Sequence, residues 1–213
     1  MSEWHIDPAY ESLLKEAGIL AYSDALAFAN GTRLSRKSHS RTWLYQRDQV
    51  RLFIKQDSST NLRTSLRALI RFSRPLAATQ KERARMMHLS TLGFRVAQVV
   101  AYGSDTSFGL PSTAVLITLP APGRSVSQIW ADPTVPEERR REARALALQT
   151  LTQLQKRGCD WGKDCKPEHF FLSEDNHITL IDVERMHFYS SPLSETRCTG
   201  QFQRFNSLLE PKK

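Results

Sequence analysis

The stretch 161-WGKDCKPEHFFL-172 carries an aspartate, a lysine and a histidine close together and then turns apolar. These polar residues are Asp164, Lys166 and His169, and a further aspartate, Asp182, ends the next apolar segment. A lone aspartate in a loop most often forms a turn or caps one. Two carboxylates with a lysine and a histidine between them instead suggest a site with chemistry of its own.

The elements predicted around this stretch hold both aspartates at loop positions. Apolar residues at helical spacing predict a long helix over residues 136–158, and the segment containing Asp164 follows it as a loop. Residues 170–182 predict two short strands around a Ser-Glu-Asp-Asn turn, so that Asp182 ends a strand. Loops held by rigid elements are where reacting groups are commonly placed, and both aspartates are therefore candidate functional residues.

This order of residues suits phosphoryl transfer. One carboxylate orients the attacking hydroxyl and accepts its proton, a second holds Mg²⁺ against the phosphates, and a lysine held by a glutamate neutralises phosphate charge. Asp164 and His169 stand at the offset of the Asp and Asn in the kinase catalytic loop, and Asp182 follows a hairpin-like stretch as the metal-binding Asp does. Upstream, Lys55 ends an apolar strand-like segment, and Glu82 lies on the next well-marked helix.

The sequence also resembles the family of lipopolysaccharide core kinases, the Kdo and heptose kinases that are distantly related to protein kinases. The segment 164-DCKPEHFFL-172 is similar to the family's loop, roughly D-C-x-x-x-H-F/I, which has His where protein kinases have Asn. The segment 181-IDVER-185 resembles the family's I-D-L/V-x-R metal motif, and 82-ERARMMHLSTLGFRVAQVVAYG-103 resembles its helix-to-strand segment. The resemblance covers about residues 28–190.

The resemblance implies an α+β, protein-kinase-like two-lobed fold. We expect one kinase-like domain over residues 1–213, with a small mixed N-lobe that contains an antiparallel sheet over about residues 1–119. A Pro- and Gly-containing hinge would follow over about residues 119–125, and a reduced, mainly helical C-lobe over about residues 126–213. The implied activity is phosphorylation of a sugar hydroxyl, heptose or Kdo, of the lipopolysaccharide inner core with ATP and Mg²⁺.

In the second half of the chain, the resemblance assigns four roles by position. Asp164 would be the catalytic base or hydroxyl-orienting carboxylate, and Lys166 would neutralise the transferred phosphoryl group. Asp182 would bind Mg²⁺, with His169 as a second ligand or phosphate contact.

In the first half, the resemblance implies the nucleotide contacts. Lys55 would contact the ATP phosphates and pair with Glu82. The backbone from Leu116 to Leu119 would meet the adenine.

Composition narrows the setting of this activity. The chain of 213 residues is 40% apolar and 24% charged, as soluble globular proteins are, and it shows neither a membrane-spanning run nor a signal pattern. We therefore expect a cytoplasmic protein. Three cysteines, Cys159, Cys165 and Cys198, have no metal spacing and fit a reducing compartment. The net charge of +8 suits a phosphorylated acceptor and peripheral contact with the anionic inner membrane.

Periodicity and turn residues outline the remaining elements. We expect helices over residues 9–30, 60–75 and 79–93, the last capped by Thr79, a hairpin of 43–46 and 50–56, and strands over 96–103 and 113–119.

Three alternatives stay open. Gly162 stands where a His often precedes the catalytic Asp, and the segment 31-GTRLSRKSHS-40 has a single Gly for a phosphate-binding loop. These departures favour a non-catalytic kinase-like protein that acts through a partner. A kinase of a different acceptor would carry the same residues. Nucleic-acid binding, suggested by the charge, is the least favoured because no aromatic–basic motif of the known modules is present.

Overall fold

The computed structural model describes residues 3–35, 40–48, 50–57, 76–107 and 110–210. The chain divides into a first unit, residues 1–84 and 98–120, and a second unit, residues 85–97 and 121–213. The division falls within helix α4 (Ala78–Thr91). The helix predicted over 60–75 and part of the segment 31–40 lie outside the described residues.

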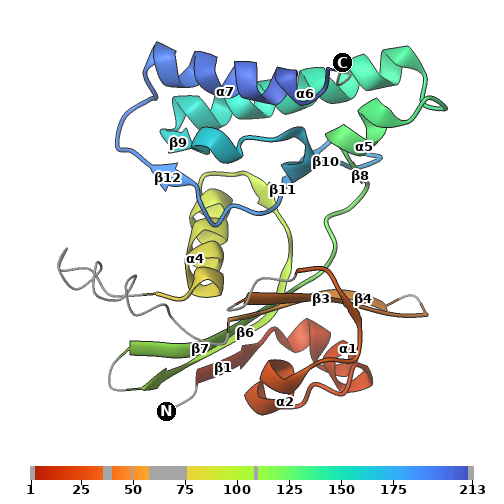
Figure 1. Ribbon diagram of the computed structural model, residues 1–213, viewed down its shortest axis with the longest axis vertical. Helices are drawn as coiled ribbons and strands as arrows, with labels where there is room; N and C mark the ends of the chain where they lie inside the picture. Colours follow the sequence, from red (N-terminus) through yellow and green to blue (C-terminus); the bar gives the residue numbers. More distant parts are fainter. Residues whose placement is uncertain (1–2, 36–39, 49, 58–75, 108–109, 211–213) are drawn as a thin grey trace. The chain divides into compact units, whose positions relative to one another are not determined.

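The first unit contains a six-stranded antiparallel sheet in the order β1-β6-β7-β4-β3-β2, and α1 (Glu11–Glu16) and α2 (Tyr22–Ala27) lie on one side of it (Figure 1). It contains the predicted hairpin of β3 (Ser40–Arg47) and β4 (Val50–Asp57), which pair from Ser40 with Asp57 to Arg47 with Val50. The hairpin prediction is therefore confirmed. The other strands of this sheet are β1 (Glu3–Ile6), β2 (Thr32–Arg33), β6 (Val99–Ser107) and β7 (Leu110–Thr118).

The single helix predicted over residues 9–30 is wrong, because this segment forms three short helices. A 3-10 helix, η1 (Pro8–Tyr10), precedes α1 (Glu11–Glu16), and α2 (Tyr22–Ala27) follows after a turn. The amide of Ile19 donates to the Leu14 carbonyl over 2.9 Å, which closes the end of α1. The Asp24 carboxylate then accepts hydrogen bonds from the amides of residues 20 and 21 at 2.9 and 2.8 Å, so it caps the start of α2.

The alternation of β4 decides which face of the sheet carries the core and which carries Lys55. Leu52 and Ile54 are fully buried in the core cluster that also contains Ala25 of α2. Gln56, also buried, donates from Nε2 to the carbonyl of Ala25 at 2.8 Å. Because successive strand residues point to opposite faces, Lys55 projects from the face opposite the one that α2 covers.

The second unit is organised around α6 (Glu137–Lys156), which confirms the long helix predicted over 136–158. Its buried side runs through Ala143, Ala147, Leu151 and Leu154. Leu146 and Thr150, beside this buried side, are half-buried. None of the helices among the described residues is long and apolar enough to cross a lipid bilayer. This unit also contains α5 (Val126–Ala131), α7 (Glu195–Ser207) and residues 85–91 of α4.

Short strands complete the second unit. β10 (Phe170–Leu172) and β11 (Ile178–Leu180) pair antiparallel, which confirms the two strands predicted over 170–182. They are joined by β8 (Arg124–Ser125) and β5 (Arg95–Val96) in a four-stranded sheet, and β9 (Cys159–Asp160) pairs with β12 (His187–Phe188).

The strand predicted over residues 96–103 is in fact two strands in two sheets. β5 ends at Val96 and runs parallel to β11, whereas β6 begins at Val99 and belongs to the six-stranded sheet. The Ala97 amide still donates to the Leu180 carbonyl at 3.3 Å, and the Gln98 carbonyl already accepts from Leu119 at 2.9 Å. Residues 96–103 all have the composition of a strand, so the sequence alone did not predict that the chain changes sheet here. The strand predicted over 113–119 is confirmed by β7.

Candidate active site

Asp164 ends a short 3-10 turn, η2 (Gly162–Asp164), directly after strand β9. The turn begins with Gly162 in the left-handed backbone region at φ 54°, where a β-carbon would be strained. The Asp164 amide donates to the carbonyl of Trp161 at 3.1 Å, and its carboxylate Oδ2 accepts from Arg185 Nη1 at 3.1 Å. The side chain of Asp164 is 26% exposed, so the carboxylate is held yet reachable by solvent.

Asp182 lies two residues beyond the end of β11, so the prediction that it ends a strand is wrong, and its backbone is unusual. Its φ is 52°, a left-handed conformation that side-chain-bearing residues seldom adopt and that persists only where the surroundings enforce it. The Trp161 indole donates to the Asp182 carbonyl at 3.4 Å and helps to hold this conformation. The Asp182 carboxylate is 55% exposed, so it combines a fixed backbone with an accessible anionic group.

His169 is buried in the second 3-10 turn, η3 (Pro167–His169), with 5% of its surface exposed. Its Nε2 lies 3.6 Å from Oδ2 of Asp182 and 3.6 Å from Oε1 of Glu168. Burial lowers the pKa of His169 below its ordinary value, although both carboxylates oppose that shift. The ring is therefore neutral near pH 7. Among the described residues, none hydrogen-bonds to the buried Nδ1 with ordinary geometry.

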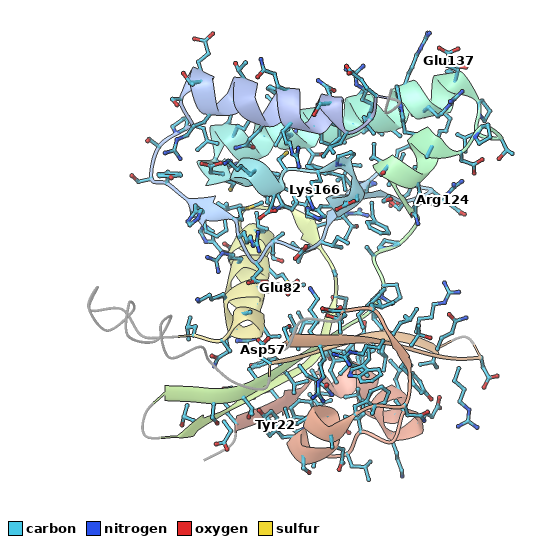
Figure 2. The ribbon with its side chains drawn as sticks, viewed as in Figure 1. Tyr22, Asp57, Glu82, Arg124, Glu137 and Lys166 are labelled. Atoms are coloured by element: carbon cyan, nitrogen blue, oxygen red, sulfur yellow. The ribbon has the colours of Figure 1, made fainter. Side chains whose placement is uncertain are left out.

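Lys166 lies in the loop between the two 3-10 turns (Figure 2). Its Nζ donates to Oε1 of Glu168 at 3.2 Å, and its side chain is 31% exposed. An ion pair of this exposure is weak, so the ammonium group can exchange Glu168 for another anion at little cost.

The second unit offers few ligands to a divalent cation. Within the described part of the chain, no group of three or more His, Cys, Asp or Glu side chains is arranged to hold a metal ion. Mg²⁺ does not need such a cage, because it keeps several waters and is commonly held by one or two carboxylates and substrate phosphates. The exposed Asp182 carboxylate fits that requirement, whereas the buried imidazole of His169 is a softer ligand than Mg²⁺ prefers.

Lys55 and Glu82 form a close ion pair in the first unit. The Nζ atom of Lys55, on β4, lies 2.6 Å from Oε1 and 2.8 Å from Oε2 of Glu82, on α4. Glu82 is 5% exposed, whereas the side chain of Lys55 is 26% exposed. Charge-assisted bonds to both carboxylate oxygens fix the ammonium group at one position on the sheet.

The start of α4 is attached to the same strand that carries Lys55. The Asp57 carboxylate, at the end of β4, accepts from the amide of Thr79 at 2.8 Å and from its hydroxyl at 2.9 Å. Thr79 was predicted to be the N-cap of this helix, and this prediction is wrong, because α4 begins at Ala78 and the Thr79 hydroxyl donates to Asp57. Figure 2 labels Asp57 and Glu82, which anchor one helix to one strand at two points.

The backbone at Leu116 and Leu119, the predicted adenine contacts, is already paired or hydrogen-bonded within the first unit. Leu116 is 1% exposed in β7 and is paired with Lys55 on one side and Tyr102 on the other. The amide of Leu119, just past β7, donates to the Gln98 carbonyl at 2.9 Å. An adenine contact through this amide would have to replace that bond.

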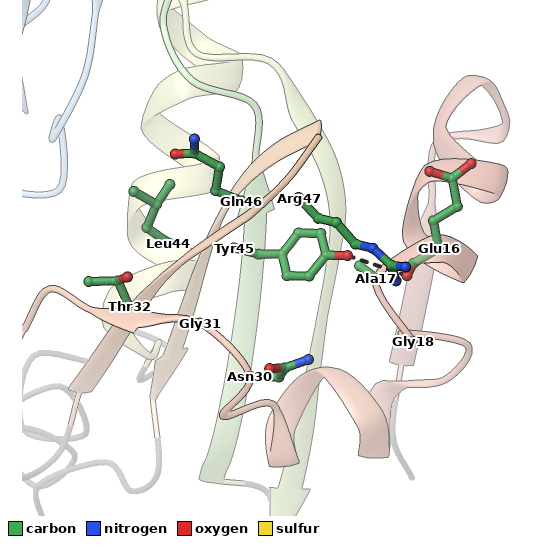
Figure 3. A pocket seen from close by; sticks show the side chains of 10 residues that line it. All are labelled: Glu16, Ala17, Gly18, Asn30, Gly31, Thr32, Leu44, Tyr45, Gln46 and Arg47. Atoms are coloured by element: carbon green, nitrogen blue, oxygen red, sulfur yellow. Dashed lines mark hydrogen bonds between the residues drawn. The ribbon is translucent and has the colours of Figure 1, made fainter. Parts of the chain in front are cut away.

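A pocket of about 700 Å³ opens elsewhere in the first unit, around the end of α1 and strand β3 (Figure 3). Its lining includes Glu16, Arg47 and Tyr45, whose hydroxyl donates to the Glu16 carbonyl at 3.4 Å. Gly31 also lines it, and a β-carbon at Gly31 would come within 2.6 Å of the Leu44 carbonyl oxygen. This glycine therefore lets the segment just before β2 approach β3 closely. The predicted site residues are not among those that line the pocket.

Sequence reasoning missed the residues that hold the Asp164 turn. Asp160 is buried and accepts hydrogen bonds from Gly162 and from two residues of α7, Arg197 and Gln201. Arg185 contacts Asp164 directly. The signal available for Arg185 was its place in the IDVER segment, but nothing local in the sequence linked Asp160 to a helix so far along the chain.

A carboxylate in a turn after a strand, a second carboxylate after a hairpin and a fixed Lys–Glu pair are the parts that kinases of the protein-kinase type use. A model of the lipopolysaccharide kinase (Kdo/WaaP) family matches residues 29–195, and the chain belongs to this family. Membership supports a kinase of the lipopolysaccharide core.

One solved structure similar to this chain is described as WaaP in complex with acyl carrier protein. The similarity has a TM-score of 0.61 at 18% identity and covers 96% of this chain and 80% of that chain. It supports the mixed fold of antiparallel sheets and helices. No curated protein sequence matches the chain.

Proposed function

We propose that this chain transfers a phosphoryl group from ATP to a sugar hydroxyl, heptose or Kdo, of the lipopolysaccharide inner core, with Mg²⁺. The observation that carries the proposal is the pair of held but reachable carboxylates, Asp164 and Asp182, in one unit of a chain from this family. We further propose one protein-kinase-like domain with an N-lobe of residues 1–119, a hinge of 119–125 and a C-lobe of 126–213.

In the proposed reaction, the acceptor hydroxyl attacks the γ-phosphorus of ATP, and the bond from that phosphorus to the bridging oxygen of ADP breaks. Asp164 orients the hydroxyl and takes its proton, while Arg185 holds the Asp164 carboxylate at Oδ2. Lys166 exchanges Glu168 for the transferred phosphoryl group as negative charge spreads over its oxygens.

Asp182, with His169 beside it, would hold the metal. Mg²⁺ bound there would neutralise charge on the β- and γ-phosphates. The neutral ring of His169 adds no charge next to the cation, and its 3.6 Å separation from Asp182 leaves the carboxylate free to turn toward a ligand.

Lys55 would contact the ATP phosphates, with Glu82 fixing its ammonium group. The bidentate bond leaves Lys55 little rotamer freedom to lose when ATP binds. Backbone groups from Leu116 to Leu119 would contact the adenine, with the Leu119 amide exchanging the Gln98 carbonyl for the base.

The net charge of +8 supports a polyanionic acceptor at the cytoplasmic face of the inner membrane. Basic side chains near an anionic leaflet each contribute roughly 1 kcal/mol of attraction at the surface, and this attraction weakens with salt. Peripheral contact of this kind would bring the enzyme to a lipid-borne sugar.

A thermal-shift titration with ATP, with and without Mg²⁺, tests the metal assignment. Ligands that bind only the folded chain raise its melting temperature. We expect a Mg²⁺-dependent rise in the natural chain that Asp182→Asn removes. Asp48→Asn is the matched control, because Asp48 has nearly the same backbone, φ 51°, in an exposed hairpin turn. Loss of the rise in both variants, or in neither, would overturn the assignment of Asp182.

A non-catalytic kinase-like protein is the alternative. It is favoured by the ion pair that already engages Asp164 with Arg185 and by the single glycine of the segment 31–40. This alternative predicts nucleotide binding that is absent or independent of Mg²⁺, together with no transfer to any acceptor.

A further inference from the structure

We infer that α7 (Glu195–Ser207) is a positioning element of the proposed active site and acts through Asp160 and Trp161. The inference rests on the proposed function, because it concerns the aim of Asp164 and Asp182. The family model ends at residue 195, so α7 lies almost wholly beyond the matched segment. Neither Asp160 nor any residue of α7 contacts substrate in this account.

Asp160 receives three hydrogen bonds in a nearly closed environment, with 8% of its surface exposed. Its Oδ1 accepts from Gln201 Nε2 at 2.7 Å and from the Gly162 amide at 2.8 Å. Its Oδ2 accepts from Arg197 Nη1 at 2.6 Å. One carboxylate therefore ties two successive turns of α7 to the backbone that leads to Asp164.

The bond to the Gly162 amide selects the conformation of the Asp164 turn. Gly162 has φ 54°, and the next two bonds of the turn run from the Asp164 amide to Trp161 and from the Cys165 amide to Gly162. A buried carboxylate that accepts the first amide of a strained turn fixes the direction in which the turn leaves the strand. Asp160 thereby sets where the Asp164 carboxylate lies.

A second route runs from α7 to Asp182 through aromatic rings. Phe205 of α7 is fully buried, and its ring meets Phe170 edge to face at 5.3 Å between centroids. Phe170 in turn lies 5.2 Å from Trp161, whose indole donates to the Asp182 carbonyl. The same helix therefore supports the backbone of both proposed catalytic carboxylates.

A substitution at Gln201 can distinguish a positioning role of α7 from a general contribution of this helix to stability. It is 2% exposed and contributes one donor to Asp160, so Gln201→Met keeps the side-chain size and removes that bond. Gln203 lies on the exposed side of the same helix, which makes Gln203→Met the matched control. Arg197→Met is a second, milder variant, because the Arg197 side chain is 49% exposed.

Two measurements on the full chain test the inference. Hydrogen exchange at the amides of Gly162 and Asp164 should speed up roughly tenfold in Gln201→Met and in Arg197→Met, but not in Gln203→Met. In phosphotransfer assays, kcat should fall roughly tenfold in the first two variants while KM for ATP stays within about twofold, because misplacement of a reacting group affects the chemical step.

The outcomes separate the two proposals. Exchange at these amides that matches the Gln203→Met control in both variants would overturn the positioning role, whatever the activity. An unchanged kcat beside faster exchange would also overturn it, because the turn would then not aim Asp164. If the natural chain transfers no phosphate, the proposed function fails, while the exchange result still decides whether α7 holds the turn.

Discussion

Arg185 donates from Nη1 to Oδ2 of Asp164 over 3.1 Å, although the guanidinium side chain is 67% exposed. The hydrogen bond that Arg185 donates to Asp164, together with the negative charge of that carboxylate, raises the pKa of Arg185, so the guanidinium stays charged. The bond engages one carboxylate oxygen and restrains the rotation of the other. In the proposed reaction, Arg185 would therefore be a positioning residue for Asp164.

Removing that guanidinium should slow catalysis more than it weakens the fold. Because an exposed ion pair contributes only about 0.2–1 kcal/mol to stability, we expect Arg185→Met to lower the unfolding free energy by no more than that amount. We expect kcat to fall roughly tenfold, with partial recovery in Arg185→Lys. Steady-state kinetics and urea unfolding on the same samples provide the check. A large loss of stability at unchanged kcat would contradict the positioning role.

The pair of Lys55 and Glu82 should couple strongly in a double-mutant cycle. Glu82 is nearly buried, so Lys55→Met leaves its carboxylate with less compensation and should cost about 1–3 kcal/mol of stability. The double variant Lys55→Met, Glu82→Gln should lose less than the sum of the single changes. Urea unfolding measures all four states of the cycle. Simple additivity would show that the ion pair is not what holds these two residues.

The main helices and strands of this fold can be predicted from local sequence patterns, whereas the contacts that hold the candidate site cannot. Alternating apolar residues on either side of a turn specify the β3–β4 hairpin, and helical spacing specifies α6. The neighbourhoods of Asp164 and Asp182 could be outlined from the residues beside them in the chain. Local patterns also predicted that Lys55 lies on a strand and Glu82 on a helix, but β4 continues for two residues past Lys55, where the strand was expected to end.

Long-range contacts account for what the sequence did not reveal. Asp160 is held by Arg197 and Gln201, which only the packing of α7 brings to it. β5 joins β11 in parallel, so the change of sheet near Ala97 depends on a strand far along the chain. Neither contact leaves a periodic signal in its own neighbourhood.

His169 should make stability fall in mild acid. Burial lowers its pKa, so between that lowered value and about pH 6.5 the unfolded chain binds a proton that the folded chain does not. The contribution of neutral His169 is therefore complete above about pH 6.5 and is lost as the pH falls toward the folded-state pKa. Urea unfolding across this range should show the decline in the natural chain and a shallower one in His169→Gln.

His5→Gln provides the control for that measurement, because the His5 side chain is 47% exposed. This substitution removes an imidazole at the surface and leaves the buried ring of His169 in place. An identical decline in His169→Gln would show that another group is responsible.

The buried thiols should resist alkylation. Burial raises the pKa of Cys165 to about 12 and that of Cys159 to about 11, and both side chains are almost fully enclosed. Because the thiolate is the reactive form, iodoacetamide near neutral pH should modify the less buried Cys198 first. Mass spectrometry of the native and the urea-unfolded chain locates the label. Equal labelling of Cys165 and Cys198 in the native chain would contradict this expectation.

The central claim is that Asp164 takes the proton of an acceptor hydroxyl during phosphoryl transfer. The most direct measurement follows the γ-phosphate of labelled ATP onto lipopolysaccharide inner-core sugars with the natural chain, Asp164→Asn and the exposed-turn control Asp48→Asn. The account predicts transfer that depends on Mg²⁺, a loss of roughly a hundredfold or more in Asp164→Asn, and no loss in Asp48→Asn. Equal transfer by the natural chain and Asp164→Asn, or no transfer by the natural chain to these sugars, would contradict it.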